Sequence, residues 1–158
     1  MPAHRTLRVR ARARGAELRR FRPFRGGAFV GYTGFLAIGF GGAIGCWLRW
    51  LLGSLLNHFF PTLPPGTLAA NLLGGLLMGG AMGVWDHFQT LPPELRLFVF
   101  TGFLGGLTTF STFSAESSTL LLRQQYLWFA GHLLVHLVGS IALTLLGIAL
   151  ARGLLRAL

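Results

Sequence analysis

The chain has 158 residues, enough for one compact domain, and 53% of them are hydrophobic while only 11% are charged. A soluble domain carries about 25% charged residues, so this composition indicates a membrane protein. The net charge of +10 comes from 14 arginines with no lysine, and nine of these arginines lie within the first 25 residues. The positive charge therefore belongs to a tail, and the pattern argues against a protein that binds nucleic acid.

Residues 1–28 form this Arg-rich tail, which has no apolar face long enough to bury. We expect it to be disordered or to lie on anionic lipid headgroups. A translation start near Val30 is the alternative to an expressed tail. Residues 29–158 are predicted to form one domain of four membrane-spanning helices.

The first helix is predicted over residues 31–57, because about 20 apolar residues span a bilayer. Small residues and one arginine recur at four-residue intervals, which places Gly41, Gly45, Arg49 and Gly53 on one helix face. Such a stripe of small residues packs helices together in membranes. Arg49 is expected to face protein, where it holds the structure or attracts anions; the alternative is that it snorkels to the interface. Cys46 is expected to be a small packing residue.

The second helix is predicted over residues 66–85, after a turn of prolines and aromatic residues, FFPTLPPG, at 59–66. One face carries a hydroxyl, an amide and a glycine ridge at four-residue spacing: Thr67, Asn71, Gly75, Gly79 and Gly83. A buried asparagine can simply join two helices by hydrogen bonds, so spacing alone does not assign Asn71 to a site.

The third helix is predicted over residues 95–122 and contains TGFLGGLTTFSTFSAE at 101–116. Its glycines loosen the helix and its hydroxyls can satisfy the backbone groups that are freed, so we expect a break within 105–109. Irregular backbone at membrane depth is tolerated only inside protein or beside a water-filled cavity. Beyond the break, helical spacing places three polar residues on one side: Thr109, Thr112 and Glu116.

The fourth helix is predicted over residues 126–151 and carries a polar stripe at four-residue spacing: His132, His136, Ser140 and Thr144. A metal site from the two histidines is conceivable, but the spacing is weak support without a nearby carboxylate or cysteine. No spacing suggests a catalytic constellation, so we do not expect an enzyme. A channel, a transporter and a structural membrane subunit remain as function classes.

Three segments in order closely resemble the CrcB/Fluc fluoride-channel family: GGAIGCWLRW at 41–50, PPGTLAANLLGG at 64–75, and the stretch at 101–116. The run LLVHLVGS at 133–140 is similar too. The resemblance begins near Phe35 and extends to the C-terminus, leaving the tail outside it. It implies a fluoride-specific channel in the inner membrane of a prokaryotic cell, through which fluoride leaves the cytoplasm passively.

The resemblance also implies an architecture and a set of site residues. It implies an antiparallel, dual-topology homodimer with two pores and a structural Na⁺ at its centre, held by backbone carbonyls of Gly105 and Thr108. The pore residues that it implies are Asn71, Phe110 and Phe113, with Thr67, Ser111 and Thr112 as further hydroxyl donors, and His136 and Ser140 on the fourth helix. It places Arg49 and Glu116 near the pore ends or vestibules.

The residue types suit a path for fluoride, since Asn, Thr and Ser supply donors without a fixed cation that would trap the anion. A near-even charge bias suits dual topology: Arg96, Arg152 and Arg156 lie on one predicted side and Arg123 on the other, whereas the Arg-rich tail would fix one orientation. Two alternatives remain. One is a proton-coupled efflux transporter of the small multidrug resistance type, which wants a carboxylate in the first helix. The other is a non-conducting membrane scaffold.

Overall fold

The structure, a computed structural model, describes residues 31–157, and within them every regular element is helical. The expectations for the tail at 1–28 and for a start at Val30 lie outside the described residues. Four helical spans in this part of the chain are long and apolar enough to cross a membrane. The chain is therefore a multi-pass membrane protein, as its composition predicts.

The first two helices, α2 (Tyr32–Leu56) and α3 (Pro65–His87), are joined by the short proline-containing turn. Proline is well placed at the start of α3, because the first amide of a helix has no intrahelical partner. The Asn57 Oδ1 atom accepts a hydrogen bond from the Gly66 N–H at 2.8 Å, which closes the turn. Both helices fall within two residues of their predicted bounds.

The third span is broken, as the sequence predicts, and consists of four pieces. They are α4 (Pro93–Arg96), the π-helix η1 (Leu97–Leu104), α5 (Gly105–Leu107) and α6 (Phe110–Leu122). The break lies at Thr108 and Thr109, inside the predicted window. The π-helical segment was not predicted; π-helical geometry is rare and frequently marks functional sites.

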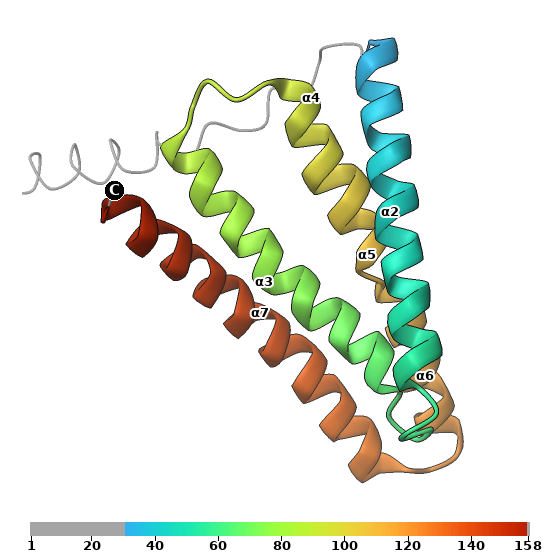
Figure 1. Cartoon of the computed structure of the whole chain (residues 1–158). Helices are drawn as coiled ribbons and strands as arrows, with labels where there is room; N and C mark the ends of the chain where they lie inside the picture. The colour runs from blue at the N-terminus through green and yellow to red at the C-terminus, as the bar shows by residue number, and fades with distance from the viewer. Residues whose placement is uncertain (1–30, 158) are drawn as a thin grey trace, which may run out of the picture.

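The fourth span, α7 (Tyr126–Arg156), runs five residues further than the predicted end at residue 151. Its C-terminal end lies beside the end of α3, where Arg152 Nη2 donates to Asp86 Oδ2 at 2.7 Å. Figure 1 shows α3 and α7 side by side, and α2 beside the broken span. The described ends of the chain thus lie on the same side of the bundle, as expected.

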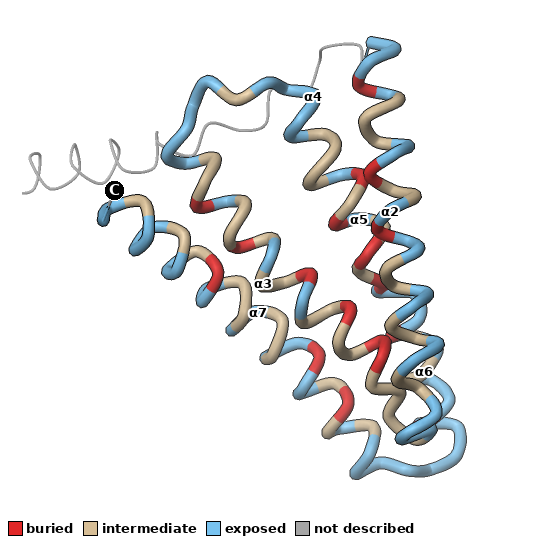
Figure 2. The backbone as a smooth tube through the Cα atoms, viewed as in Figure 1, coloured by how far each residue is buried: buried red, intermediate tan, exposed pale blue. Residues whose placement is uncertain are grey.

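Glycines allow α2 to pack closely against the broken span and α3 to pack closely against α7. A Cβ on Gly41 or Gly45 would collide with backbone atoms of η1, and one on Gly79 would collide with the α7 backbone at Thr144. These contacts confirm that the glycine stripes are helix-packing faces. Figure 2 shows the buried residues along these contacts and the exposed residues on the outward faces, where apolar side chains would meet lipid or another subunit.

Candidate functional site

The break in the third span is made by two residues with extended backbone. Thr108 has φ −80° and ψ 155°, and Thr109 has φ −148° and ψ 106°. Thr109 is the N-cap of α6: its Oγ1 accepts a hydrogen bond from the Thr112 N–H at 3.1 Å and donates to Thr112 Oγ1 at 2.9 Å. A threonine in this position satisfies an amide that the helix start would leave without a partner.

The break redirects two amides that would otherwise continue the helix. The Thr109 N–H donates to Asn71 Oδ1 at 2.8 Å, and the Thr112 N–H donates to Thr109 Oγ1. In an uninterrupted helix these amides would bind the carbonyls of Gly105 and Thr108, four residues earlier. Both carbonyls are thereby left free of their helical donors. These two carbonyls are the ones to which the family resemblance assigns a sodium ion.

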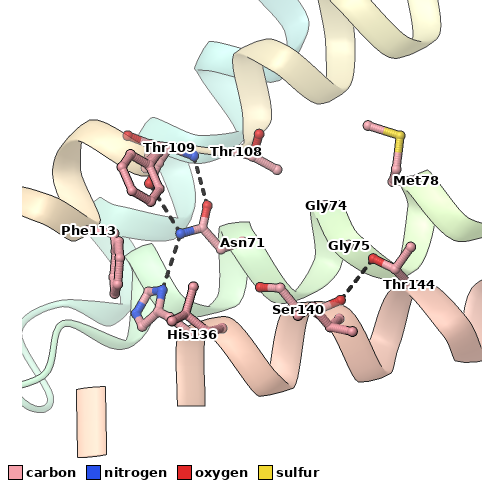
Figure 3. Close-up of a pocket in the computed structure, with 13 residues that line it drawn as sticks. Asn71, Gly74, Gly75, Met78, Thr108, Thr109, Phe113, His136, Ser140 and Thr144 are labelled. Atoms are coloured by element: carbon pink, nitrogen blue, oxygen red, sulfur yellow. Dashed lines mark hydrogen bonds between the residues drawn. The ribbon is translucent and has the colours of Figure 1, made fainter. Parts of the chain in front are cut away.

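Asn71 on α3 is tied to the break from both ends of its amide, as Figure 3 shows. Besides accepting from the Thr109 N–H, it donates from Nδ2 to the Thr109 carbonyl at 3.2 Å. Nδ2 also lies 3.2 Å from His136 Nδ1 on α7. One side chain therefore connects three of the spans, a role that goes beyond the simple helix-joining that spacing alone allows.

A pocket of about 320 Å³ lies beside this asparagine, between α3, α7 and the break. It brings together five of the predicted pore residues: Asn71, Phe110, Phe113, His136 and Ser140. Its walls also include residues that were not predicted to line the pore: Gly74, Gly75, Met78, Thr109, Leu137, Ile141 and Thr144. Polar groups thus line a hollow in a strongly apolar chain.

The two phenylalanines of the motif differ in their surroundings. Phe113 is buried, and its ring lies 5.2 Å from that of His132 and 4.9 Å from that of His136. Phe110 is 75% exposed, although it lines the pocket and its ring centroid is 5.6 Å from that of Phe113. One side of the pocket is consequently open in the single chain.

A second cavity of about 270 Å³ lies between α2, the start of α3 and the start of α6. Its walls include Arg49, Thr67, Thr109 and Thr112, so Thr109 borders both cavities. Arg49 is half-buried in the wall of this cavity, and its Nη2 donates to Cys46 Sγ on the same helix at 3.5 Å. The prediction for Cys46 was wrong, because its side chain is exposed rather than packed within the chain.

Glu116 is held on the same side of the bundle as the second cavity. Thr67 Oγ1 donates to its Oε1 at 2.7 Å, and its Oε2 lies 3.6 Å from His132 Nε2. The expectation that the histidine pair has no nearby carboxylate was therefore wrong. Ser111 lines neither cavity, and its Oγ is 3.2 Å from Thr109 Oγ1.

Thr109 is the main site residue that was not predicted from the sequence. It borders both cavities, caps α6 and binds Asn71. A hydroxyl residue just before a helix start is a recognisable N-cap signal, so its capping role was open to prediction. Its contact with Asn71 depends on how α3 packs against the break, which spacing does not reveal.

These features define a class: a multi-pass membrane protein with a broken helix and a polar, partly open site midway along its spans. The chain matches the family described as CrcB-like protein, Camphor Resistance (CrcB), over residues 36–148, and it belongs to that family. It is 60% identical over 119 residues to a protein of Nitrosospira multiformis named fluoride-specific ion channel FluC, covering 75% of this chain and 93% of that protein.

Two further relatives carry the same name. The protein of Cupriavidus taiwanensis is 56% identical over 119 residues, covering 75% of this chain and 94% of its own length. The protein of Tolumonas auensis is 58% identical over 114 residues, covering 72% and 90%. The family to which the chain belongs is thus one of ion channels rather than of enzymes.

Proposed function

We propose that the chain forms a fluoride-specific channel through which fluoride leaves the cytoplasm passively, which lowers its internal concentration and gives fluoride resistance. Relatives of this similarity are named as fluoride-specific channels, which supports the proposal. The observation that carries it is the anchoring of Asn71 at the break, beside a pocket that also holds Phe110, Phe113 and Ser140.

Fluoride is small and strongly hydrated, so a pore must replace its water with donors in a narrow space. The Asn71 amide is held by the Thr109 N–H with Nδ2 directed away from it, towards the Thr109 carbonyl and His136. Both Nδ2 contacts are 3.2 Å, at the long end for an N–H hydrogen bond, so an anion replaces one of them at small cost. The edges of the Phe110 and Phe113 rings carry partial positive charge and complete the path.

Three of the remaining predicted pore residues, Thr67, Thr112 and Ser140, extend this path in both directions, whereas Ser111 lines neither cavity. Thr67 and Thr112 line the second cavity, where Arg49 supplies positive charge and Glu116 accepts from Thr67. Ser140 continues the first pocket along α7. Hydroxyls and an amide bind an anion more weakly than a fixed cation does, as conduction requires.

The functional unit is an antiparallel, dual-topology homodimer. Gly105, Phe110, Ser111 and Thr112 are all exposed in one chain, although they lie midway along the broken span. Irregular backbone exposed to lipid does not occur within the hydrocarbon region, so this surface requires a protein cover. A second copy with the opposite orientation brings two breaks face to face and closes the open side of each pocket.

A structural Na⁺ at the dimer centre fits the donor set of the break. The carbonyls of Gly105 and Thr108 have lost their helical donors, and uncompensated carbonyls at membrane depth are costly. Two such carbonyls from each subunit offer the oxygen ligands that hard cations prefer. The ion would supply positive charge that fixes the two breaks against each other.

The alternatives are less well supported. α2 carries no carboxylate, whereas a transporter of the small multidrug resistance type wants one in its first helix. A scaffold subunit accounts for neither the polar pocket nor the cap at the break. The names and organisms of the relatives also support a bacterial inner membrane as the location of the channel.

The test is fluoride efflux from liposomes that contain the purified protein, read with a fluoride electrode, with chloride as the control ion. We expect rapid fluoride release without chloride release. Asn71→Asp is expected to abolish this flux, because a carboxylate oxygen replaces Nδ2 opposite the Thr109 carbonyl and repels an anion in the pocket. Gln89→Glu is the matched control, since it makes the same change from amide to carboxylate at an exposed loop residue that lines neither cavity.

Phe110→Ile is likewise expected to abolish flux while leaving the dimer intact, because an aliphatic side chain fills the space without a positive ring edge. Its exposure in the single chain means that the fold does not depend on the ring. Size-exclusion chromatography in detergent checks the dimer. Wild-type flux in either variant removes that residue from the pore, and chloride release by the wild type contradicts the proposed selectivity.

A further inference from the structure

Three buried polar atoms beside the pocket have no hydrogen-bond partner within the described residues. They are Glu116 Oε2, His132 Nε2 and His136 Nε2. One ligand atom from each residue lies within 4.8 Å of the others. Glu116 Oε2 and His132 Nε2 lie 3.6 Å apart, within ion-pair distance but too far for a hydrogen bond. Buried polar atoms are rarely left without a hydrogen bond, and a ligand that binds all three atoms would satisfy them.

We propose that Glu116, His132 and His136 form a binding site for a transition-metal ion of the Zn²⁺ type. Two histidines and one glutamate are an established zinc ligand set, with an open fourth position for water or an anion. Ligand atoms about 2.0–2.2 Å from a tetrahedral zinc are roughly 3.3–3.6 Å apart. The 3.6 Å between His132 Nε2 and Glu116 Oε2 matches that spacing, whereas the limit for the whole group is 4.8 Å, so the ligand atoms would have to close by up to about 1 Å to bind the ion.

The surroundings hold two of the ligands in place. Thr67 Oγ1 donates to Glu116 Oε1 at 2.7 Å, which leaves Oε2 to face the histidines. The His132 ring stacks on Phe113 at an interplanar angle of 25°. Groups that orient metal ligands in this way are a regular feature of metal sites. Glu116 keeps 16% of its side chain exposed, which provides an entry path beside the two buried histidines.

Asn71 affects the metal affinity of the third proposed ligand, His136, because the two side chains are in contact. Because the Thr109 N–H fixes Oδ1 as the acceptor, Asn71 Nδ2 must donate, and His136 Nδ1 accepts from it. A neutral His136 therefore carries its proton on Nε2. Metal binding at Nε2 moves the proton to Nδ1, where it meets the Asn71 NH₂ group instead of an acceptor. The hydrogen bond to Asn71 thus weakens metal binding and competes with it.

This competition gives the proposal a distinctive prediction. Asn71→Asp places a carboxylate oxygen opposite His136 Nδ1, and a carboxylate accepts the Nδ1–H proton, as it does in many zinc sites. Asn71→Asp is therefore expected to bind zinc more tightly than the wild type, by about tenfold or more. A purely structural role of Asn71 would not raise metal affinity.

Binding is measured on the purified full-length protein in detergent, by competition for Zn²⁺ with a chromophoric chelator and by the visible absorption of added Co²⁺. We expect one strong site per chain and a tetrahedral Co²⁺ spectrum. His132→Gln and Glu116→Gln are expected to lower the affinity at least tenfold. The control is His58→Gln combined with His87→Gln, since these histidines lie outside the cluster and should leave the site unchanged.

Several results would overturn the proposal: no zinc bound, a site that survives His132→Gln, or zinc affinity in Asn71→Asp no higher than in the wild type. Helical content and size-exclusion profile of each variant verify that it is folded. A second readout rests on the proposed channel function: Zn²⁺ should inhibit fluoride efflux from wild-type liposomes but not from His132→Gln liposomes. Failure of the flux assay alone leaves the binding result standing and counts against the channel function instead.

Discussion

The packing of α3 against α7 depends on Gly79 and not on its neighbour Gly80, so alanine substitutions at these two positions form a matched pair. A Cβ on Gly79 would collide with the Thr144 carbonyl oxygen and would lie 2.8 Å from Thr144 C and 3.0 Å from Ile148 N. A Cβ on Gly80 would meet no atom of residues 31–157 within 4 Å. Both glycines lie inside α3, so alanine alters the intrinsic helix propensity equally at the two positions.

The magnitudes follow from these contacts. Alanine is favoured over glycine inside a helix by roughly 0.5–1 kcal/mol, so Gly80→Ala is expected to stabilise the protein by about that amount. At Gly79 the obstacles are backbone atoms, which no side-chain rotation removes, so α3 and α7 must move apart. Overpacking costs about 1–3 kcal/mol or more, so Gly79→Ala is expected to be less stable than Gly80→Ala by that amount.

Unfolding of each variant in mixed micelles, followed by tryptophan fluorescence, measures the difference in the free energy of unfolding. The comparison between two adjacent positions cancels the effect of alanine on the helix itself. If Gly79→Ala and Gly80→Ala unfold within about 0.5 kcal/mol of each other, α3 does not pack on α7 in this register. The positions of Asn71 and His136 relative to each other would then need revision too, since they lie on the same two helices.

Two further predictions concern the cap and the surface. Thr109→Val removes the hydroxyl that caps α6 and is expected to lower the free energy of unfolding by about 1 kcal/mol. Thr109→Ser keeps the hydroxyl and should retain the wild-type stability. Equal free energies of unfolding for the two variants would contradict the capping role. Arg152→Gln breaks the ion pair with Asp86, whose two side chains are 54% and 63% exposed. We therefore expect the free energy of unfolding to fall by less than about 1 kcal/mol at low salt and not to change in high salt. A larger decrease, or one that persists in high salt, would contradict the assignment of this pair as a weak surface ion pair.

Features that repeat along one helix were predictable from the sequence. The four spans follow from apolar length, and the glycine faces follow from four-residue spacing. The break followed from glycines beside hydroxyl residues, and it falls at Thr108 and Thr109 as expected. Each of these signals is local, because the physics that produces it acts within one helix or at its surface.

Contacts between helices were not predictable in this way. Glu116 and His132 belong to different spans, and their approach depends on how α6 is rotated and shifted along α7. A second example is the π-helical segment at Leu97–Leu104, in which each turn holds more residues than an α turn, so that different side chains face α2 than in an α-helix. The apolar sequence of that segment carries no periodic signal of the change.

The hydrogen bond from the Thr109 N–H to Asn71 Oδ1 connects the proposed sodium site with the proposed fluoride path. By leaving the helix, this N–H frees the Gly105 carbonyl that is proposed to bind sodium. By fixing Oδ1, it also turns Nδ2 towards His136 and the pocket, where a donor is needed for an anion. The cation site and the anion path therefore share one interaction. A substitution that breaks this hydrogen bond should therefore disturb the sodium site as well as the fluoride path, even though the Asn71 side chain lines only the fluoride path.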